Sequence, residues 1–112
     1  MQILRPNFEK RDDPKLKAWA GLVTVVVQNA KTREVLMVAF ADEEAVRKTL
    51  KTGMATFFTT SRGRLWTKGE ESGNFMKVVD VRIDCDGDAL LYLVEPQGDG
   101  VACHIGARSC WS

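Results

Sequence analysis

The chain has 112 residues, of which 45% are hydrophobic and 28% are charged, and its formal net charge at pH 7 is +1. This length fits one domain, because a second hydrophobic core would need more residues than remain. The nearly neutral charge argues against a general attraction to nucleic acid or to an acidic membrane surface, so any basic site must be local and neither is expected as a partner.

Residues 1–20 are interpreted as an N-terminal arm that precedes one domain over residues 21–112. The arm mixes charged residues with Pro6 and shows no apolar periodicity, although a short helix is possible over residues 14–20. It lacks the apolar core of a signal peptide, and no later stretch approaches the roughly 20 apolar residues that span a bilayer. We therefore expect a soluble, cytoplasmic protein.

Two runs rich in β-branched and other apolar residues, at 22–28 and 34–40, flank a polar turn and predict a β-hairpin. A helix is predicted over residues 43–52, where apolar side chains recur at helical spacing. Asp42 precedes this helix as a candidate N-cap, and Gly53 follows it where a left-handed C-cap would lie.

Three more strands are predicted further along the chain, at residues 55–60, 76–84 and 89–95. Residues 61–74 are interpreted as a connecting loop, and residues 96–100 as a flexible loop rich in glycine. With about five strands against one or two short helices, the predicted fold class is mainly β and borderline α+β. We expect a small mixed sheet with a helical cover.

Asp84, Asp86 and Asp88 place a carboxylate at every second position around Cys85. In an extended chain these carboxylates would point to one side and the thiol to the other, because strand side chains alternate. Carboxylates suit a hard cation such as Mg²⁺, whereas a thiolate suits Zn²⁺. A plain turn between two strands remains the alternative, since Asp and Gly dominate turns. An EF-hand is excluded, because Ala89 replaces the glycine that its loop requires and a strand follows.

The other two cysteines, Cys103 and Cys110, share a run of eight residues with His104, the only histidine of the chain. In a reducing compartment an odd number of cysteines favours a metal site over disulfides. With Cys85 they make three soft ligands, which leaves a fourth zinc position open for water, and His104 could carry protons. Three alternatives remain open, namely small buried cysteines, a hydrogen-bonded structural histidine, and a structural zinc site completed by His104.

Residues 61–74 combine two arginines, a lysine, several hydroxyl groups and three glycines. Such a stretch can wrap phosphate groups with charge-assisted and backbone hydrogen bonds. An ordinary solvated hairpin loop is the alternative. The candidate substrate-binding residues are Ser61, Arg62, Trp66, Lys68, Glu70, Ser72 and Asn74.

Four segments together resemble the phosphoribosyl-AMP cyclohydrolase family, in register over about residues 21–111: GLVTVVVQNA, SRGRLWTKGEESGN, DCDGDALL and ACHIGARSCW. The resemblance implies a mainly β subunit that forms an intertwined homodimer with its active sites at the interface. It also implies one zinc per subunit, held by Cys103 and Cys110 together with Cys85 of the partner subunit. The family's magnesium ligands and its catalytic histidine correspond to Asp84, Asp86, Asp88 and His104.

The implied activity is hydrolysis of the adenine ring of phosphoribosyl-AMP in the third step of histidine biosynthesis. Zinc-activated water would add to C6 and the N1–C6 bond would break, which gives a formimino-aminoimidazole carboxamide ribotide (ProFAR). His104 would move protons, and magnesium would anchor or polarise the substrate. The positive charge of Arg108 or of Mg²⁺ is hypothesised to make the zinc-bound water more acidic. Because the sequence ends at Ser112, the monofunctional form of the family is expected.

Two departures from the family pattern affect the expected substrate contacts. Phe58, Thr59 and Thr60 stand where the family often has Trp-Ser-Arg, and Ile105 replaces a frequent threonine. The alternative function is a small structural-zinc module that binds nucleotides or RNA through residues 62–68. A zinc deaminase of free bases is set aside, because the H-x-E and P-C-x-x-C signatures are missing.

Overall fold

The computed structural model describes residues 21–102 and 107–111. The predicted N-terminal arm, with its possible helix, lies outside the described residues, and so do Cys103 and His104. In the described part of the chain, no helix is both long and apolar enough to cross a membrane.

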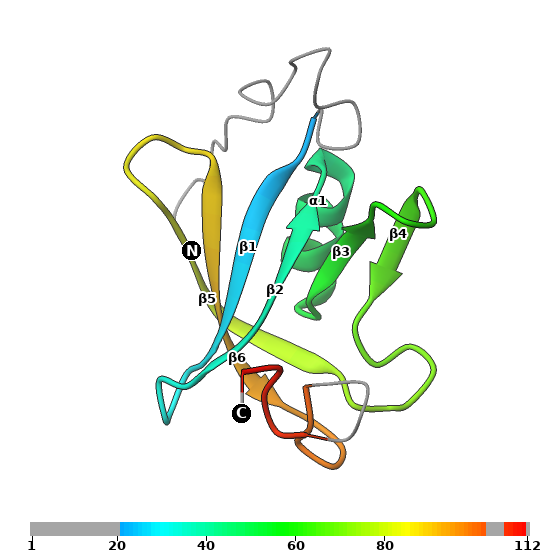
Figure 1. Ribbon diagram of the computed structural model, residues 1–112, viewed down its shortest axis with the longest axis vertical. Coiled ribbons are helices and arrows are strands. Elements are labelled where there is room, and N and C mark those ends of the chain that lie inside the picture. Colours follow the sequence, from blue (N-terminus) through cyan, green and yellow to red (C-terminus); the bar gives the residue numbers. More distant parts are fainter. Residues whose placement is uncertain (1–20, 103–106, 112) are drawn as a thin grey trace.

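The strands form two sheets (Figure 1). The larger sheet has the strand order β2-β1-β6-β5, with bounds Val35–Ala41, Val23–Asn29, Ala89–Pro96 and Met76–Ile83. It is mixed, because β1 pairs in parallel with β6 and antiparallel with β2, while β5 is antiparallel to β6. The smaller sheet pairs β3 (Thr56–Thr59) with β4 (Arg64–Thr67). The expected mainly β fold with a small mixed sheet is confirmed.

Five of these strands lie where the sequence predicts them, and the first two form the predicted antiparallel hairpin. The interpretation of residues 61–74 as a loop is wrong for β4. This strand has only four residues, which is too short for hydrophobic alternation to stand out. It is held by its pairing with β3, in which Phe57 lies opposite Trp66.

Helix α1 (Glu43–Thr52) begins and ends at the predicted caps. The Asp42 carboxylate accepts a hydrogen bond from the backbone N–H of Ala45 at 2.8 Å. Gly53 ends the helix in the left-handed conformation with φ 78°, where a side chain would be strained. The buried side of α1 carries Ala45, Val46 and Thr49, and the helix packs on β2 and β3 (Figure 1).

The hydrophobic core lies between one face of the larger sheet and the layer made by α1 and β3. Alternate residues of β1 and β6 point into this core, because strand side chains alternate between the two faces. Phe57 of β3 stacks on Tyr92 of β6, with ring centroids 6.2 Å apart. The fully buried residues of these two strands are Val23, Val25, Val27, Leu90, Tyr92 and Val94.

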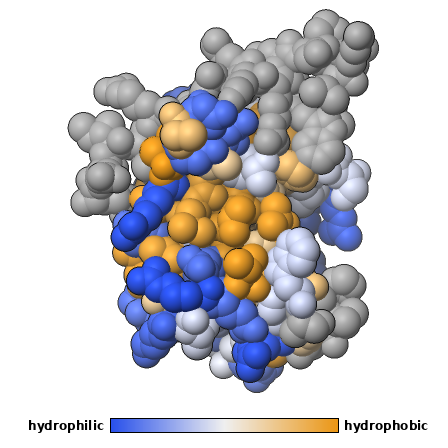
Figure 2. All heavy atoms as spheres, turned by 60° about the vertical axis from the view of Figure 1, so that its left-hand side comes forward, coloured by the Kyte–Doolittle hydropathy of each residue, from blue (hydrophilic) through white to orange (hydrophobic). Residues whose placement is uncertain are grey.

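The opposite face of the larger sheet also carries apolar side chains. Val26 lies at its centre, with Val38 of β2 and Leu91 of β6 as its register partners. Val38 is 44% exposed, and Val79 on the edge strand β5 is 43% exposed. Figure 2 shows hydrophobic side chains gathered on the side of the molecule that carries β5 and β1, framed by hydrophilic ones. Both faces of this sheet are therefore rich in apolar surface.

Candidate functional site

The segment Asp84-Cys85-Asp86-Gly87-Asp88 forms the turn between β5 and β6, so the chain there does not meet the condition of an extended backbone. One carboxylate oxygen of Asp84 accepts hydrogen bonds from the backbone N–H groups of Asp88 at 3.1 Å and Ala89 at 3.2 Å. Gly87 adopts a φ of 79°, which favours glycine. The acidic residues thus build the turn, as the alternative interpretation expected.

The same turn gathers the three carboxylates. Asp84, Asp86 and Asp88 each offer an oxygen, and these atoms lie within 4.8 Å of one another. A set of hard oxygen donors at this spacing fits a divalent cation such as Mg²⁺, because a bound cation would draw them together and offset their mutual repulsion. Cys85 lies exposed on this turn. The turn and the cluster are therefore compatible, and flanking strands exclude an EF-hand.

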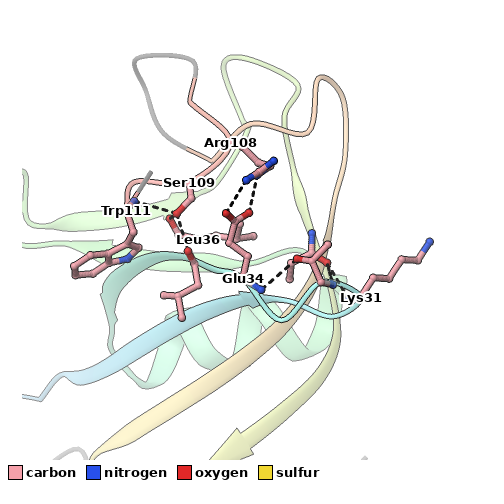
Figure 3. A network of polar contacts seen from close by, with 9 residues as sticks. Lys31, Glu34, Leu36, Arg108, Ser109 and Trp111 are labelled. Atoms are coloured by element: carbon pink, nitrogen blue, oxygen red, sulfur yellow. Dashed lines mark hydrogen bonds and ion pairs between the residues drawn. The ribbon is translucent and has the colours of Figure 1, made fainter.

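Cys110 is held at the first residues of β2. Its backbone N–H donates to the carbonyl of Leu36 at 2.8 Å, while its side chain is exposed. The neighbouring Arg108 forms a bidentate pair with Glu34, at 2.8 Å from Nε and 3.0 Å from the second guanidinium nitrogen (Figure 3). The hydrogen bonds and the charge of Glu34 raise the pKa of Arg108 above its usual value.

Cys85 and Cys110 lie toward opposite ends of β1. The acidic turn adjoins the first residues of this strand, since the Thr24 N–H donates to the Asp88 carbonyl at 3.2 Å. Cys110 contacts Leu36, whose neighbours in β2 pair with the last residues of β1. The anchor positions on β1, Thr24 and Gln28, are four residues apart, which is roughly 13 Å along a strand. Two thiolates on one zinc lie at most about 4.6 Å apart, so the two cysteines are anchored too far apart along β1 for one zinc.

A basic pocket opens beside the smaller sheet. It has a volume of about 640 Å³ and combines two guanidinium groups, two hydroxyl groups, a carboxylate and an indole ring. Thr59 lies opposite Arg64 in the β3–β4 register, and its hydroxyl accepts from the Arg62 backbone N–H at 3.1 Å. The lining residues are Thr59, Ser61, Arg62, Arg64, Trp66 and Glu71.

This pocket includes three residues that the sequence singled out, Ser61, Arg62 and Trp66, and three that it missed. Arg64 could have been found by reading 64–67 as a strand, because Arg64 and Trp66 then share one face. Thr59 follows from the same register, since it lies opposite Arg64. No sequence signal distinguishes Glu71 from the neighbouring Glu70.

The other four candidate substrate residues have contacts within the same segment or with a nearby loop. The Lys68 ammonium lies 5.4 Å from the Trp66 ring centroid. Glu70 lies 3.5 Å from Arg64, and the Ser72 hydroxyl accepts from the backbone N–H of Asn74 at 3.2 Å. The Asn74 side-chain oxygen accepts from the Asp99 N–H at 2.9 Å. Substrate binding by these four residues stays a prediction.

Comparison with known proteins places the chain among named relatives. Residues 37–112 match the family model described as phosphoribosyl-AMP cyclohydrolase. The phosphoribosyl-AMP cyclohydrolase of Archaeoglobus fulgidus is 57% identical over 91 residues, which cover 81% of this chain and 82% of that protein. The chain belongs to the phosphoribosyl-AMP cyclohydrolase family.

Two further relatives of the cyclohydrolase family extend the comparison. The phosphoribosyl-AMP cyclohydrolase of Methanocorpusculum labreanum is 56% identical over 98 residues, covering 88% of this chain and 78% of that protein. The histidine biosynthesis bifunctional protein HisIE of Aquifex aeolicus is 50% identical over 91 residues, which cover 81% of this chain but 44% of that protein. The cyclohydrolase match over residues 37–112 includes the basic pocket, the acidic turn and Cys110. The chain is accordingly an enzyme of this family.

Proposed function

We propose that this enzyme hydrolyses the adenine ring of phosphoribosyl-AMP, breaking the N1–C6 bond to give ProFAR in histidine biosynthesis. The observation that carries this proposal is the 57% identity to a named phosphoribosyl-AMP cyclohydrolase over 81% of the chain. The basic pocket and the acidic turn supply, in addition, donor groups that suit a phosphorylated substrate and a divalent cation.

The basic pocket is proposed to hold the phosphate-bearing part of the substrate. Arg62 and Arg64 both line it, and two guanidinium groups can bind phosphate oxygens in a bidentate manner. The hydroxyls of Thr59 and Ser61 can donate further hydrogen bonds. Trp66 offers an aromatic surface, and its ring is braced by Phe57 at a centroid distance of 5.8 Å. The pocket would orient the substrate so that its ring is presented to the reacting groups.

The proposed zinc ligands are Cys85, Cys103 and Cys110, and the proposed magnesium ligands are Asp84, Asp86 and Asp88. Zinc with three protein ligands and an open position would supply hydroxide at neutral pH. His104, next to Cys103 in the chain, would take the proton from the oxygen added at C6 and deliver it to N1. The oxygen then remains on C6 as a carboxamide, and N1 leaves with the proton, so that the ring is open.

We further propose that the enzyme is a homodimer in which each zinc is shared between subunits. The separation of Cys85 and Cys110 along β1 supports this, because one zinc could not reach both thiols of one chain. The apolar face around Val26 and Val38 supports it too, since monomers seldom expose contiguous apolar surface (Figure 2). Beside the acidic turn this surface continues as a hollow lined by Val26, Ile83, Ala89 and Leu91 among others.

The first test is turnover of phosphoribosyl-AMP by the purified, zinc-quantified protein in the presence of Mg²⁺, followed by absorbance. Ring opening with about one zinc per chain, abolished in Cys103→Ala and His104→Ala, is the expected result. The absence of turnover in folded, zinc-loaded wild-type protein would contradict the proposal. A small structural-zinc module that binds nucleotides or RNA would then be the better account.

A further inference from the structure

The short segment that carries Cys110 is fastened to the start of β2 by side chains as well as by its backbone (Figure 3). Ser109 is only 1% exposed, and its hydroxyl donates to the carbonyl of Val35 at 2.6 Å. The same hydroxyl accepts from the backbone N–H of Trp111 at 3.0 Å. The Ser109 hydroxyl therefore links β2 to Trp111, the residue after Cys110, through these two hydrogen bonds.

A second attachment lies two residues before Cys110. Arg108 and Glu34 form two parallel hydrogen bonds, a geometry that fixes orientation as well as distance. The Arg108 side chain is 73% exposed, so this pair adds little to folding stability, because solvent screens exposed ion pairs. The Arg108–Glu34 pair instead restricts the orientation of the segment that carries Cys110 relative to β2.

These contacts fix the backbone of Cys110 while leaving its side chain exposed. The Cys110 N–H bond to Leu36 completes the attachment, so three consecutive residues are each bound to residues 34–36. A ligand whose backbone is already fixed loses less conformational entropy on binding a metal than one on a loose tail.

We propose that Ser109, together with the Arg108–Glu34 pair, is a positioning element that preorganises Cys110 as a metal ligand. This inference rests on the proposed function, in which Cys110 binds zinc. It assigns Arg108 a mechanical part in the site, because the guanidinium charge is directed at Glu34. The earlier hypothesis gave Arg108 an electrostatic part, so the two ideas predict different results.

The experiment measures zinc affinity by competition with a chelator, on the full-length protein and its Ser109→Ala variant. We expect the variant to bind zinc roughly 10- to 100-fold more weakly, the usual effect of losing a group that supports a ligand. Excess zinc should restore its turnover, whereas a variant damaged in its fold would not recover. An unchanged affinity in Ser109→Ala would overturn the proposal.

The matched control is Thr49→Val. Thr49 is equally buried, and its hydroxyl also donates to backbone carbonyls, those of Ala45 and Thr56, but it lies on α1 far along the chain from Cys110. It should lose stability without losing zinc affinity. Equal losses of affinity in both variants would mean that general destabilisation is responsible, and would also overturn the proposal.

Variants of the ion pair separate position from charge. Glu34→Gln leaves the Arg108 charge unopposed, so an electrostatic role predicts a pH–rate profile shifted to lower pH with zinc affinity unchanged. The positioning role predicts weaker zinc binding and an unshifted profile, with recovery in the double exchange Glu34→Arg and Arg108→Glu. Failure of wild-type protein to bind zinc would overturn this inference and the proposed function together, whereas normal zinc binding with unaffected variants would overturn the inference alone.

Discussion

Tyr92 places a phenol hydroxyl inside the hydrophobic core. Its side chain is fully buried beside Phe57, and within the described part of the chain the hydroxyl has no hydrogen-bond partner of good geometry. Burial raises the pKa of Tyr92 to about 12, and the smaller, opposite effect of the nearby Thr49 hydroxyl lowers it. An unpaired buried hydroxyl is costly, so this position is better suited to an apolar ring.

Tyr92→Phe should leave the free energy of unfolding at pH 7 unchanged or raise it by about 1 kcal/mol, because the removed hydroxyl is unpaired. The measurement is chemical denaturation at a fixed zinc concentration. A loss of 2 kcal/mol or more, as an order of magnitude, would indicate that the hydroxyl makes a strong hydrogen bond in the folded protein.

The same residue makes stability depend on alkaline pH. The folded pKa of about 12 lies above the ordinary tyrosine pKa of 10.0, so the folded protein keeps the phenol proton that the unfolded chain releases. Stability from this group is intact below pH 10 and is lost as the pH rises toward 12, by roughly 2–3 kcal/mol in total. Denaturation of wild type against Tyr92→Phe isolates this loss, and parallel curves for the two proteins would contradict it.

Gly98 lies in the loop between β6 and Cys103 and has a φ of 63°. A Cβ there would lie 2.8 Å from the carbonyl oxygen of Gly73, and it would also overlap the Asn74 side chain that binds Asp99. Gly98→Ala should therefore destabilise the protein by about 2–3 kcal/mol in thermal or chemical unfolding. Gly100→Ala is the control, because φ is 73° but no atom lies within 4 Å, so about 1 kcal/mol is expected. Equal losses of unfolding free energy in both variants would show that the close contact of residue 98 with Gly73 and Asn74 is not the cause.

At the scale of elements, the acidic residues of the β5–β6 turn both build the turn and form the carboxylate cluster. Asp84 uses one oxygen to bind two backbone N–H groups, and this folds the turn so that Asp86 and Asp88 come back beside it. The sequence suggested the cluster from alternation in an extended strand, whereas the structure obtains it from a turn. The expected grouping was right for a different geometric reason.

Mg²⁺ should stabilise the protein through this turn. At about 100 times the dissociation constant, a bound ion raises the free energy of unfolding by about 2.7 kcal/mol. We expect Asp86→Asn to lose most of this Mg²⁺-dependent rise in melting temperature, because one of the three carboxylates is neutralised. Asp99→Asn, an exposed carboxylate outside the cluster, should respond to Mg²⁺ as wild type does. The same Mg²⁺ response in Asp86→Asn would argue against a site on the turn.

The β3–β4 sheet shows where local patterns fail. The caps of α1 were predictable, because Asp42 and Gly53 act through contacts within a few residues. Strand β4 was not predictable from the sequence, because its four residues carry too little periodicity and its stability comes from pairing with β3. Because the pairing of β3 with β4 aligns Thr59 with Arg64, the sequence also failed to predict these two pocket residues.

At the scale of the whole molecule, the decisive feature is the distance between Cys85 and Cys110. Each thiol lies near a different end of β1, so residues that the sequence groups as one ligand set do not meet in one chain. The apolar face around Val26 and Val38 is the surface that we propose for the second copy. A shared site would make folding, dimerisation and metal binding depend on one another.

Complementation between inactive variants tests the shared zinc site. Cys85→Ala and Cys110→Ala should each be inactive alone. After refolding together with zinc, half of the dimers should be mixed, and each mixed dimer has one intact site of two, so about a quarter of wild-type turnover should return. No recovery in a mixture shown to contain mixed dimers would contradict a site built from both subunits. A site within one chain predicts that outcome.

The sequence by itself determined the family, the class of fold, the helix with both caps, and the residue types available for chemistry. These follow from local periodicity, from capping and from motifs, all of which act within short stretches of chain. The acidic cluster and part of the basic pocket could also be predicted from the sequence, because their members are close together in the chain.

Only the tertiary structure decided which of these groups meet. It joined Thr59 and Glu71 to the arginines of the pocket, bound Arg108 to Glu34 across 74 residues of sequence, and separated Cys85 from Cys110. The physical reason is that such contacts depend on strand order and register, which are set by the packing of the whole core and by pairing between distant segments. Residue type and spacing fix what a group can do, and the packed sheet fixes what it can reach.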